Sequence, residues 1–299
     1  MSARPTTEPS DSEPSDSEPS DPESSDSGSS DSGPGTARPP VPSPAAGSRP
    51  RSGVPCDVTG ALDDVARIGP FFELPVLARS SKNPVPFSRL LADPGPLVDR
   101  IARVRDSLGS DERVAASIAF QGLVARLVSA PLAAVVLHGV LPDLAGLCRL
   151  PDGDDPWAPG LSGSGGSVVP DPLEDPRGAA AVLGDELVDA LLVPLAGTVR
   201  GLVAVSGHVL HGNVASALAG SARVLDTARP GSRPALLGVL GALLEHPSLS
   251  GTGRLLRLEP DVADTEWGFR RRSCCLYYRV PGGGTCGDCV LTARRAELA

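Results

Sequence analysis

Four of the six cysteines in this 299-residue chain fall within sixteen residues, at Cys274, Cys275, Cys286 and Cys289. Their spacing is C-C-x10-C-x2-C, and thiols gathered so closely are typical of a metal site or a redox centre. Only the second pair has the spacing of a zinc knuckle. Neighbouring side chains of an extended chain point to opposite sides, so the adjacent pair suits a larger target, such as a 2Fe-2S cluster with four thiolate positions. An iron–sulfur cluster, a zinc ion and unligated or redox-active thiols all stay open on spacing alone.

Basic residues and glycines surround these cysteines. The arginines at 270–272 and Arg279 could neutralise an anionic cluster, guide an acidic electron donor, or form an ordinary solvated edge. The glycines at 282–284 and Gly287 permit tight turns that bring backbone N–H groups towards sulfur. An ordinary hairpin turn would account for the same glycines.

The cysteine segment and a second motif upstream of it resemble those of a known family. Arg-Arg-Ser-Cys-Cys-Leu-Tyr-Tyr at 271–278 and Pro-Gly-Gly-Gly-Thr-Cys-Gly-Asp-Cys at 281–289 are similar to the C-terminal iron–sulfur segment of the FhuF-like ferric siderophore reductases. Gly-Asn-Val-Ala-Ser-Ala-Leu at 212–218 resembles a second family motif, although His211 stands where the family usually has Trp. A weaker likeness runs from residues 113–117 through residues 140–143, a stretch that is similar to the central helices of the family. The whole resemblance spans roughly residues 60–299.

The resemblance implies a cytoplasmic enzyme of iron homeostasis that reduces siderophore-bound Fe(III) by one electron. It implies a 2Fe-2S cofactor held by the four cysteines, a ferric siderophore as substrate and a separate one-electron donor such as a ferredoxin. The chemistry is sound, because hard oxygen ligands hold Fe(III) strongly and release Fe(II) more readily. Two alternatives are a non-enzymatic zinc-knuckle protein and a 2Fe-2S redox sensor or electron carrier without a siderophore site.

Residues outside the cysteine segment are weaker candidates. Asn213 follows Gly212 at a predicted helix start, where a helix cap or a contact to substrate or cluster would both explain it. His211 either lines a substrate pocket or is a partly buried imidazole with its hydrogen bonds satisfied. Arg271, Arg272 and Arg279 are candidates for tuning the cluster or for contacting the donor or substrate.

Composition excludes several classes of function. The net charge is −9, and nine acidic and three basic residues in 1–50 account for most of it, so no overall basic nucleic-acid footprint exists. No apolar run is long enough for an integral membrane span, and no secretory leader is visible. Motifs for nucleotide, flavin or nicotinamide binding are absent, so electrons must come from another protein. These features predict a cytoplasmic protein with reduced thiols.

The periodicity of the sequence predicts mostly helix. Ser110 is expected to cap a helix carrying Phe120, Leu123 and Leu127, and Pro131 is expected to start a new one. A helical pattern over 185–210 is expected to break at Pro194. Short extended segments are predicted at 71–76, 147–150 and 255–258.

We therefore expect an α+β, mostly helical single domain with a disordered N-terminal tail and a short C-terminal cluster-binding hairpin. The predicted boundaries are 1–53 for an acidic Ser/Pro-rich tail, 54–260 for the helical siderophore-reductase-like domain and 261–299 for the 2Fe-2S-binding segment. The tail is expected to be disordered because its composition offers no apolar surface to offset the entropy of ordering.

Overall fold

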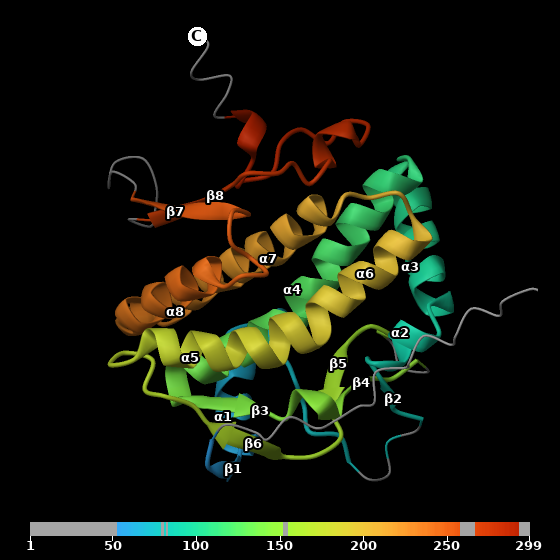
Figure 1. Cartoon of the computed structure of the whole chain (residues 1–299). Helices are drawn as coiled ribbons and strands as arrows, with labels where there is room; N and C mark the ends of the chain where they lie inside the picture. The colour runs from blue at the N-terminus through green and yellow to red at the C-terminus, as the bar shows by residue number, and fades with distance from the viewer. Residues whose placement is uncertain (1–52, 79–80, 82, 152–154, 258–266, 293–299) are drawn as a thin grey trace, which may run out of the picture. The chain divides into compact units, whose positions relative to one another are not determined.

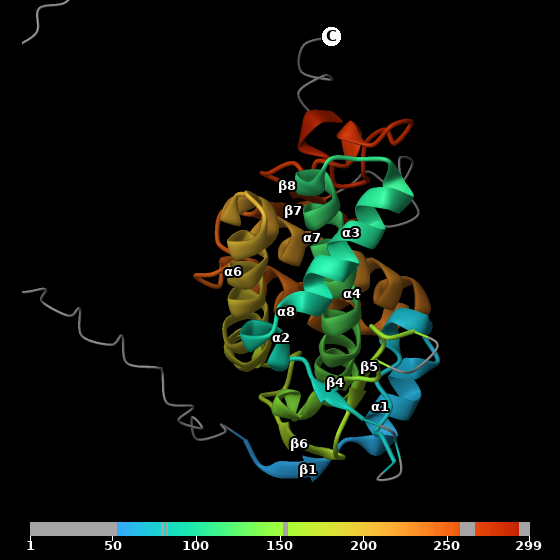
Figure 2. The same ribbon diagram turned by 90° about the vertical axis from the view of Figure 1, so that its right-hand side faces the viewer.

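Two long helices, α4 (Glu112–His138) and α7 (Gly207–Ala228), lie beside each other along much of their length (Figure 1). The structure is a computed structural model, and it describes residues 53–78, 81, 83–151, 155–257 and 267–292. Helix α4 is apolar on nearly every side, so it can be buried by neighbours all round. Figure 2 shows α3 and α6 flanking this pair. The predicted disordered tail lies outside the described residues, apart from its last residue.

The remaining helices pack around this pair. Helix α3 contacts α4, α5 contacts α8, and α6 and α8 both contact α7. The bounds of these helices, with the π-helix η3 and the 3-10 turns, are α1 Thr59–Ala66, η1 Pro70–Phe72, α2 Arg89–Ala92, α3 Gly95–Leu108, η2 Leu144–Gly146, α5 Pro176–Leu183, η3 Gly184–Leu192, α6 Val193–Leu202, η4 Pro230–Ser232, α8 Arg233–Glu245 and η5 Tyr277–Arg279.

Two prolines predicted to interrupt helices do not do so. Pro131 lies inside α4, and Pro194 lies at the second position of α6, which continues directly from the π-helix η3. An internal proline removes one backbone hydrogen bond and costs about 3 kcal/mol. At Pro131 the surrounding turns of α4 are buried, so tertiary packing offsets that cost. At Pro194 the wider π-helical turn before it accommodates the ring, and π-turns are known sites of such adjustment.

Two local predictions were wrong in detail. Asp111, not Ser110, caps α4, because its carboxylate Oδ1 accepts a hydrogen bond from the Val114 amide at 2.9 Å. A residue one position later can cap equally well when its side chain reaches the free amides. Residues 70–72 form the 3-10 turn η1 instead of extended chain, with Phe72 buried against the core.

The strands form three small antiparallel sheets. Two of them have three strands each, in the orders β1-β6-β3 and β2-β4-β5. The third is the two-stranded hairpin β7-β8. The predicted strands near 147–150 and 255–258 correspond to β4 and β7. The strand bounds are β1 Pro55–Asp57, β2 Val85–Pro86, β3 Val140–Pro142, β4 Leu147–Arg149, β5 Pro159–Leu161, β6 Gly165–Val168, β7 Gly253–Arg257 and β8 Trp267–Arg271.

The hairpin β7-β8 is the part of the fold that leads into the cysteines. Five residue pairs join its strands, from Gly253 opposite Arg271 to Arg257 opposite Trp267. Strand β8 alternates buried and half-buried residues, and its buried residues, including Phe269 and Arg271, face the helices. Figure 1 shows the hairpin and the following segment lying across α7 and near the start of α4. The C-terminal segment is thus docked on the two central helices.

The mostly helical α+β class is confirmed. Helix α4 is long and apolar enough to cross a membrane by composition, but 72% of its most apolar stretch is buried inside the fold. Buried core helices meet the same criteria of length and composition. The domain boundaries at residues 53 and 260 stay predictions, and the second falls among residues outside the described part of the chain.

Candidate metal centre

The four clustered cysteines lie in an irregular segment that follows strand β8. Cys274 and Cys275 follow the strand after two further residues, and Cys286 and Cys289 come after a turn rich in glycine. Gly282 and Gly284 have φ values of 72° and 81°, in the left-handed region that glycine adopts without steric cost. These two glycines let the chain reverse, and the second pair of cysteines is brought back towards the first.

The sulfur atoms form one close pair and two sites that accept backbone hydrogen bonds. The Sγ atoms of Cys275 and Cys286 are 3.5 Å apart. The amide of Leu276 donates to Cys274 Sγ at 3.3 Å, and that of Leu291 donates to Cys289 Sγ at 3.4 Å. Amide hydrogen bonds to sulfur are among the features that set the potentials of iron–sulfur centres.

The sulfur geometry is compatible with a two-iron cluster. Sulfur ligands on one tetrahedral zinc lie about 3.8 Å apart, given Zn–S bonds of about 2.3 Å. Among the described residues, no three of the four Sγ atoms lie within 4.8 Å of one another. The close pair Cys275–Cys286 suits one metal ion, and neither of the other two sulfurs lies within 4.8 Å of both members of that pair. Four ligands of one tetrahedral ion would all lie close together, so the arrangement fits a group with two metal ions better than a single zinc ion.

Burial and hydrogen bonding separate the thiols chemically. The hydrogen bond between Cys275 and Cys286 lowers the pKa of Cys275 to about 6, and Arg271 acts in the same direction. The same hydrogen bond, together with partial burial, raises the pKa of Cys286. Burial also raises the pKa of Cys274. Metals bind thiolates, so metal binding to these cysteines would release their thiol protons.

A chain of buried polar groups ties the first cysteine pair to both central helices. The Asn213 amide nitrogen donates to the Ser117 carbonyl at 2.8 Å and to Ser117 Oγ at 3.0 Å, and Ser117 Oγ donates to the Cys275 carbonyl at 2.8 Å. The Asn213 carbonyl oxygen accepts from Arg271 Nη2. Asn213 lies in the middle of α7 and not at its start, so the helix-cap interpretation was wrong. Its side chain is fully buried because these partners replace water.

Gly212 explains why the segment approaches α7 so closely. A Cβ atom at this position would lie 2.2 Å from Ser273 Oγ and 3.2 Å from Arg271 Nη2. Real Cβ atoms essentially never lie within 3.0 Å of another heavy atom, so a side chain at position 212 would force Ser273 to shift, and glycine lets these two side chains lie against the helix. The Gly-Asn dipeptide therefore has two roles. Gly212 makes room for the cysteine segment, and Asn213 binds it.

Asp288 ties the second cysteine pair to α7. Its buried carboxylate accepts from Ser216 Oγ at 2.7 Å and from Arg223 Nη1 at 2.8 Å. The residue lies between Cys286 and Cys289 in Cys-Gly-Asp-Cys, and its backbone carbonyl accepts from the Arg271 amide at 3.2 Å. Asp288 thus joins the second cysteine pair both to α7 and to strand β8, which leads into the first pair.

The other predicted site residues lie in different surroundings. Arg272 is exposed, and only its backbone amide is engaged, by the Thr252 carbonyl at 2.8 Å. Arg279 is also exposed and forms an ion pair with Asp111 at 3.0 Å. His211 has a lowered pKa, because it is partly buried and lies near Arg200 and His208. Its charged neighbours therefore belong to α6 and α7 and not to the cysteine segment.

A cavity of about 440 Å³ opens beside the cysteine segment. One wall is the Cys286-Gly287-Asp288 loop, and the others come from η1, α4 and α7. Its lining is mainly apolar, with hydroxyl and amide groups from the two helices. The lining residues are Ile68, Gly69, Pro70, Phe71, Phe72, Gln121, Ala125, Ser129, Ser216, Ala217, Gly220, Ser221, Arg223, Val224, Cys286, Gly287 and Asp288. His211 is not among them.

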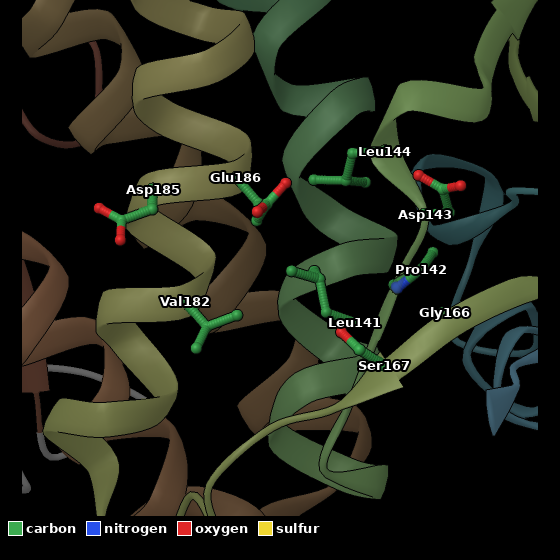
Figure 3. A pocket seen from close by; sticks show the side chains of 9 residues that line it. All are labelled: Leu141, Pro142, Asp143, Leu144, Gly166, Ser167, Val182, Asp185 and Glu186. Carbon is green, nitrogen blue, oxygen red and sulfur yellow. The ribbon is translucent and has the colours of Figure 1, made fainter. Parts of the chain in front are cut away.

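A second, smaller cavity and a group of potential metal ligands lie away from the cysteine segment. A cavity of about 50 Å³ lies between strands β3 and β6 and the helical turn at Asp185 and Glu186. It is too small for more than a few waters, and Figure 3 shows the side chains that line it. His246 lies near Asp185 and Asp189, and these three form the group of close potential metal ligands found among the described residues. The Ser248 amide donates to His246 Nδ1, so Nε2 carries the ring proton and faces the carboxylates as an ion-pair or hydrogen-bond donor.

Comparison with known families adds the deciding observation. The sequence model described as the FhuF 2Fe-2S C-terminal domain matches residues 271–291. The chain carries an FhuF-like C-terminal segment whose cofactor is a 2Fe-2S cluster. No curated protein shows significant similarity to the chain. The match covers the cysteine segment alone, so the FhuF-like resemblance of the helical domain rests on the motifs around Gly212 and residues 113–117.

The FhuF-like segment depends on residues that sequence reasoning did not single out. Ser117, Gln121, Ser216 and Arg223 each bind it, and Asp288 anchors it. The role of Asp288 could have been predicted, because an acidic residue between two cysteines of a cluster-binding motif needs a partner when it is buried. Ser117 and Ser216 lie inside the two upstream motifs that carry the family resemblance. Gln121 and Arg223 gave no signal, because glutamine and arginine are common on helix surfaces.

Proposed function

We propose that Cys274, Cys275, Cys286 and Cys289 ligate the 2Fe-2S cluster and that the protein is a one-electron reductase of ferric siderophores. When bound, such a cluster takes up one electron and passes it on. The chain's own residues then have to hold the cluster, bind the ferric chelate nearby and admit an electron donor. The observation that carries the proposal is the 440 Å³ cavity that has Cys286 in its wall.

The size and lining of the cavity suit part of a small chelate. Ligand sites typically span 300–1,000 Å³ and combine apolar walls with a few fixed polar groups. Phe71 and Val224 supply exposed apolar surface, and Gln121 and Ser221 supply hydrogen-bonding groups. Because Cys286 lies in the same wall, a chelate bound there would lie beside a cluster ligand, and no long electron path would be needed.

Arg223 connects the cavity to the cluster loop. Its guanidinium lines the cavity and is bound through Nη1 to the buried Asp288 carboxylate. The ion pair leaves the cavity without a strong net charge at this wall. Asp288 also fixes the loop on which Cys286 lies, so Arg223 and Asp288 together keep the cavity wall in place.

The electron has to come from a separate protein. The sequence has no nucleotide, flavin or nicotinamide motif. Arg272 exposes positive charge on the cysteine segment, and Arg279 adds a guanidinium that is exposed but paired with Asp111. Such charge would steer an acidic one-electron donor of the ferredoxin class. With the cluster held by the four cysteines, the donor would lose one electron in each turnover and the siderophore-bound Fe(III) would gain it and become Fe(II). Reduced thiols and this donor fit a cytoplasmic location, which forms part of the proposal.

The test uses the full chain with its cluster loaded. The dithionite-reduced protein, freed of excess reductant without oxygen, is mixed with several ferric siderophores and a ferrous-specific chelator. One Fe(II) should form per cluster reoxidised. Gly220→Leu should slow this reaction by at least tenfold, because it fills the cavity, whereas Gly197→Leu on exposed α6 should not.

Two results would count against the proposal. Absence of Fe(II) with every siderophore tested, from protein that contains about two irons and two sulfides per chain, would leave a redox sensor or electron carrier. Equal rates for Gly220→Leu and Gly197→Leu would remove the cavity from the reaction even if the wild-type chain is active.

A further inference from the structure

The side chain of Arg271 is a buried positive charge without an acidic partner. Its exposed fraction is 1%. Its hydrogen-bond acceptors are neutral: the amide oxygens of Asn213 and Gln121 and the backbone carbonyl of Val209. No carboxylate lies within ion-pair distance of it among the described residues, and Nε has no acceptor. A charge removed from water without a counter-ion is strongly unfavourable.

A second unsatisfied donor lies next to it. Ser273 Oγ is buried and has no partner in the described part of the chain, and both side chains pack against Gly212. Native proteins leave few buried donors unpaired, so two together indicate a missing acceptor. Both belong to the three residues that immediately precede Cys274.

Hydrogen bonds place this charge against both cysteine pairs. The Arg271 amide donates to the carbonyl of Asp288, which lies between Cys286 and Cys289. Asn213, which binds the guanidinium, is joined through Ser117 to the Cys275 carbonyl. The neighbouring arginines are less buried than Arg271, since Arg270 is half-buried and Arg272 is exposed to solvent. A 2Fe-2S cluster with four thiolates is anionic and gains one more negative charge on reduction.

We infer that Arg271 is the counter-ion of the cluster: its buried guanidinium balances the charge of the thiolate-bound centre and raises its reduction potential. The inference rests on the ligand set proposed above and is independent of the siderophore substrate. The reduced form carries the larger negative charge, so a nearby fixed cation stabilises it more than the oxidised form. Arginine does not lose its proton in proteins, so the effect persists across the usable pH range.

Asn213 and Gly212 hold the charge in place. Asn213 binds Arg271 with its oxygen and Ser117 with its nitrogen, and Gly212 leaves room for the guanidinium against α7. The neutral amide is suited to this role. A carboxylate at position 213 would neutralise Arg271 itself and remove the charge from the cluster.

The experiment is an EPR-monitored redox titration of the cluster-loaded full chain. Arg271→Gln should lower the midpoint potential so that the ratio of reduced to oxidised cluster at a fixed ambient potential falls about tenfold, which is about 59 mV for one electron. Arg272→Gln is the matched control and should change that ratio less than twofold. Arg271→Lys, which keeps the charge, should restore most of the loss.

Loss of the cluster from Arg271→Gln would not end the test. Asn213→Asp keeps the arginine and should lower the potential in the same direction, with iron content retained. An unchanged potential in Asn213→Asp, or equal potentials for Arg271→Gln and Arg272→Gln, would overturn the inference. A wild-type chain with no iron and sulfide would instead refute the proposed ligand set.

Discussion

The helical body and the cysteine segment are held together by different forces. In α4 and α7 the contacts are mainly apolar or between small residues, and side chains such as Leu132 and Leu218 are fully buried. The cysteine segment buries two charged side chains, Arg271 and Asp288, and attaches through hydrogen bonds. Apolar burial stabilises regardless of a cofactor, whereas buried charge requires partners. The body is therefore expected to fold without the cluster, and the segment to depend on it.

Removing one proposed ligand should have the largest effect, and that effect should be confined to the cysteine segment. Cys289→Ala should lower iron and sulfide from about two per chain to near zero, because three thiolates leave one cluster position open. Helical circular dichroism and its melting temperature should change little. Cys148→Ala is the matched control, since this buried thiol donates to the Gly160 carbonyl far from the segment in sequence. Full cluster content in Cys289→Ala would contradict the ligand set.

Truncating a core side chain should destabilise the helical body but leave cluster binding intact. Leu132→Ala in α4 removes a side chain that is fully buried and should lower the free energy of unfolding by roughly 2–5 kcal/mol. The cluster should still assemble at low temperature, where the protein stays folded. Urea denaturation measures the free energy of unfolding, and iron and sulfide analysis of the folded variant measures cluster assembly. Loss of iron from a variant that remains folded would show that the two regions are not separable.

A methyl group at the contact between the two regions should affect docking alone. Gly212→Ala would collide with Ser273 Oγ and should cost about 1–3 kcal/mol, measured as faster loss of the cluster to a chelator. Gly201→Ala in α6 is the control, because its Cβ would meet nothing within 4 Å. It should stabilise the helix by about 0.5–1 kcal/mol. Equal chelator sensitivity in both variants would argue against the close contact.

The smallest expected effect comes from one hydroxyl. Ser117→Ala removes the hydrogen bond to the Cys275 carbonyl but leaves the Ser117 carbonyl to bind Asn213. It should cost about 1 kcal/mol. The expected readout is a modest rise in amide hydrogen exchange at 275–277 with no change in the exchange of α4. Faster exchange throughout α4 would mean that the hydroxyl supports the helix and not the segment.

The sequence allowed prediction of the helical class and the cysteine segment, because apolar periodicity and thiol spacing are local signals. Prolines 131 and 194 misled because their cost is offset by tertiary packing and by a π-helical turn, neither of which is visible locally. Asn213 was misassigned for the same reason. Its partners Ser117 and Arg271 lie 96 and 58 residues away in the chain, so nothing near it indicated burial.

The place of the cysteine segment in the chain bears on how the protein matures. All four proposed ligands follow the helices that receive them, so during synthesis α4 and α7 leave the ribosome first. Domains generally fold as they emerge, N-terminal parts before C-terminal ones. The surface around Gly212 would then already exist when the cysteines appear. Cluster delivery becomes a final docking step onto a finished scaffold, and a chain that never receives its cluster should accumulate as a folded, colourless precursor.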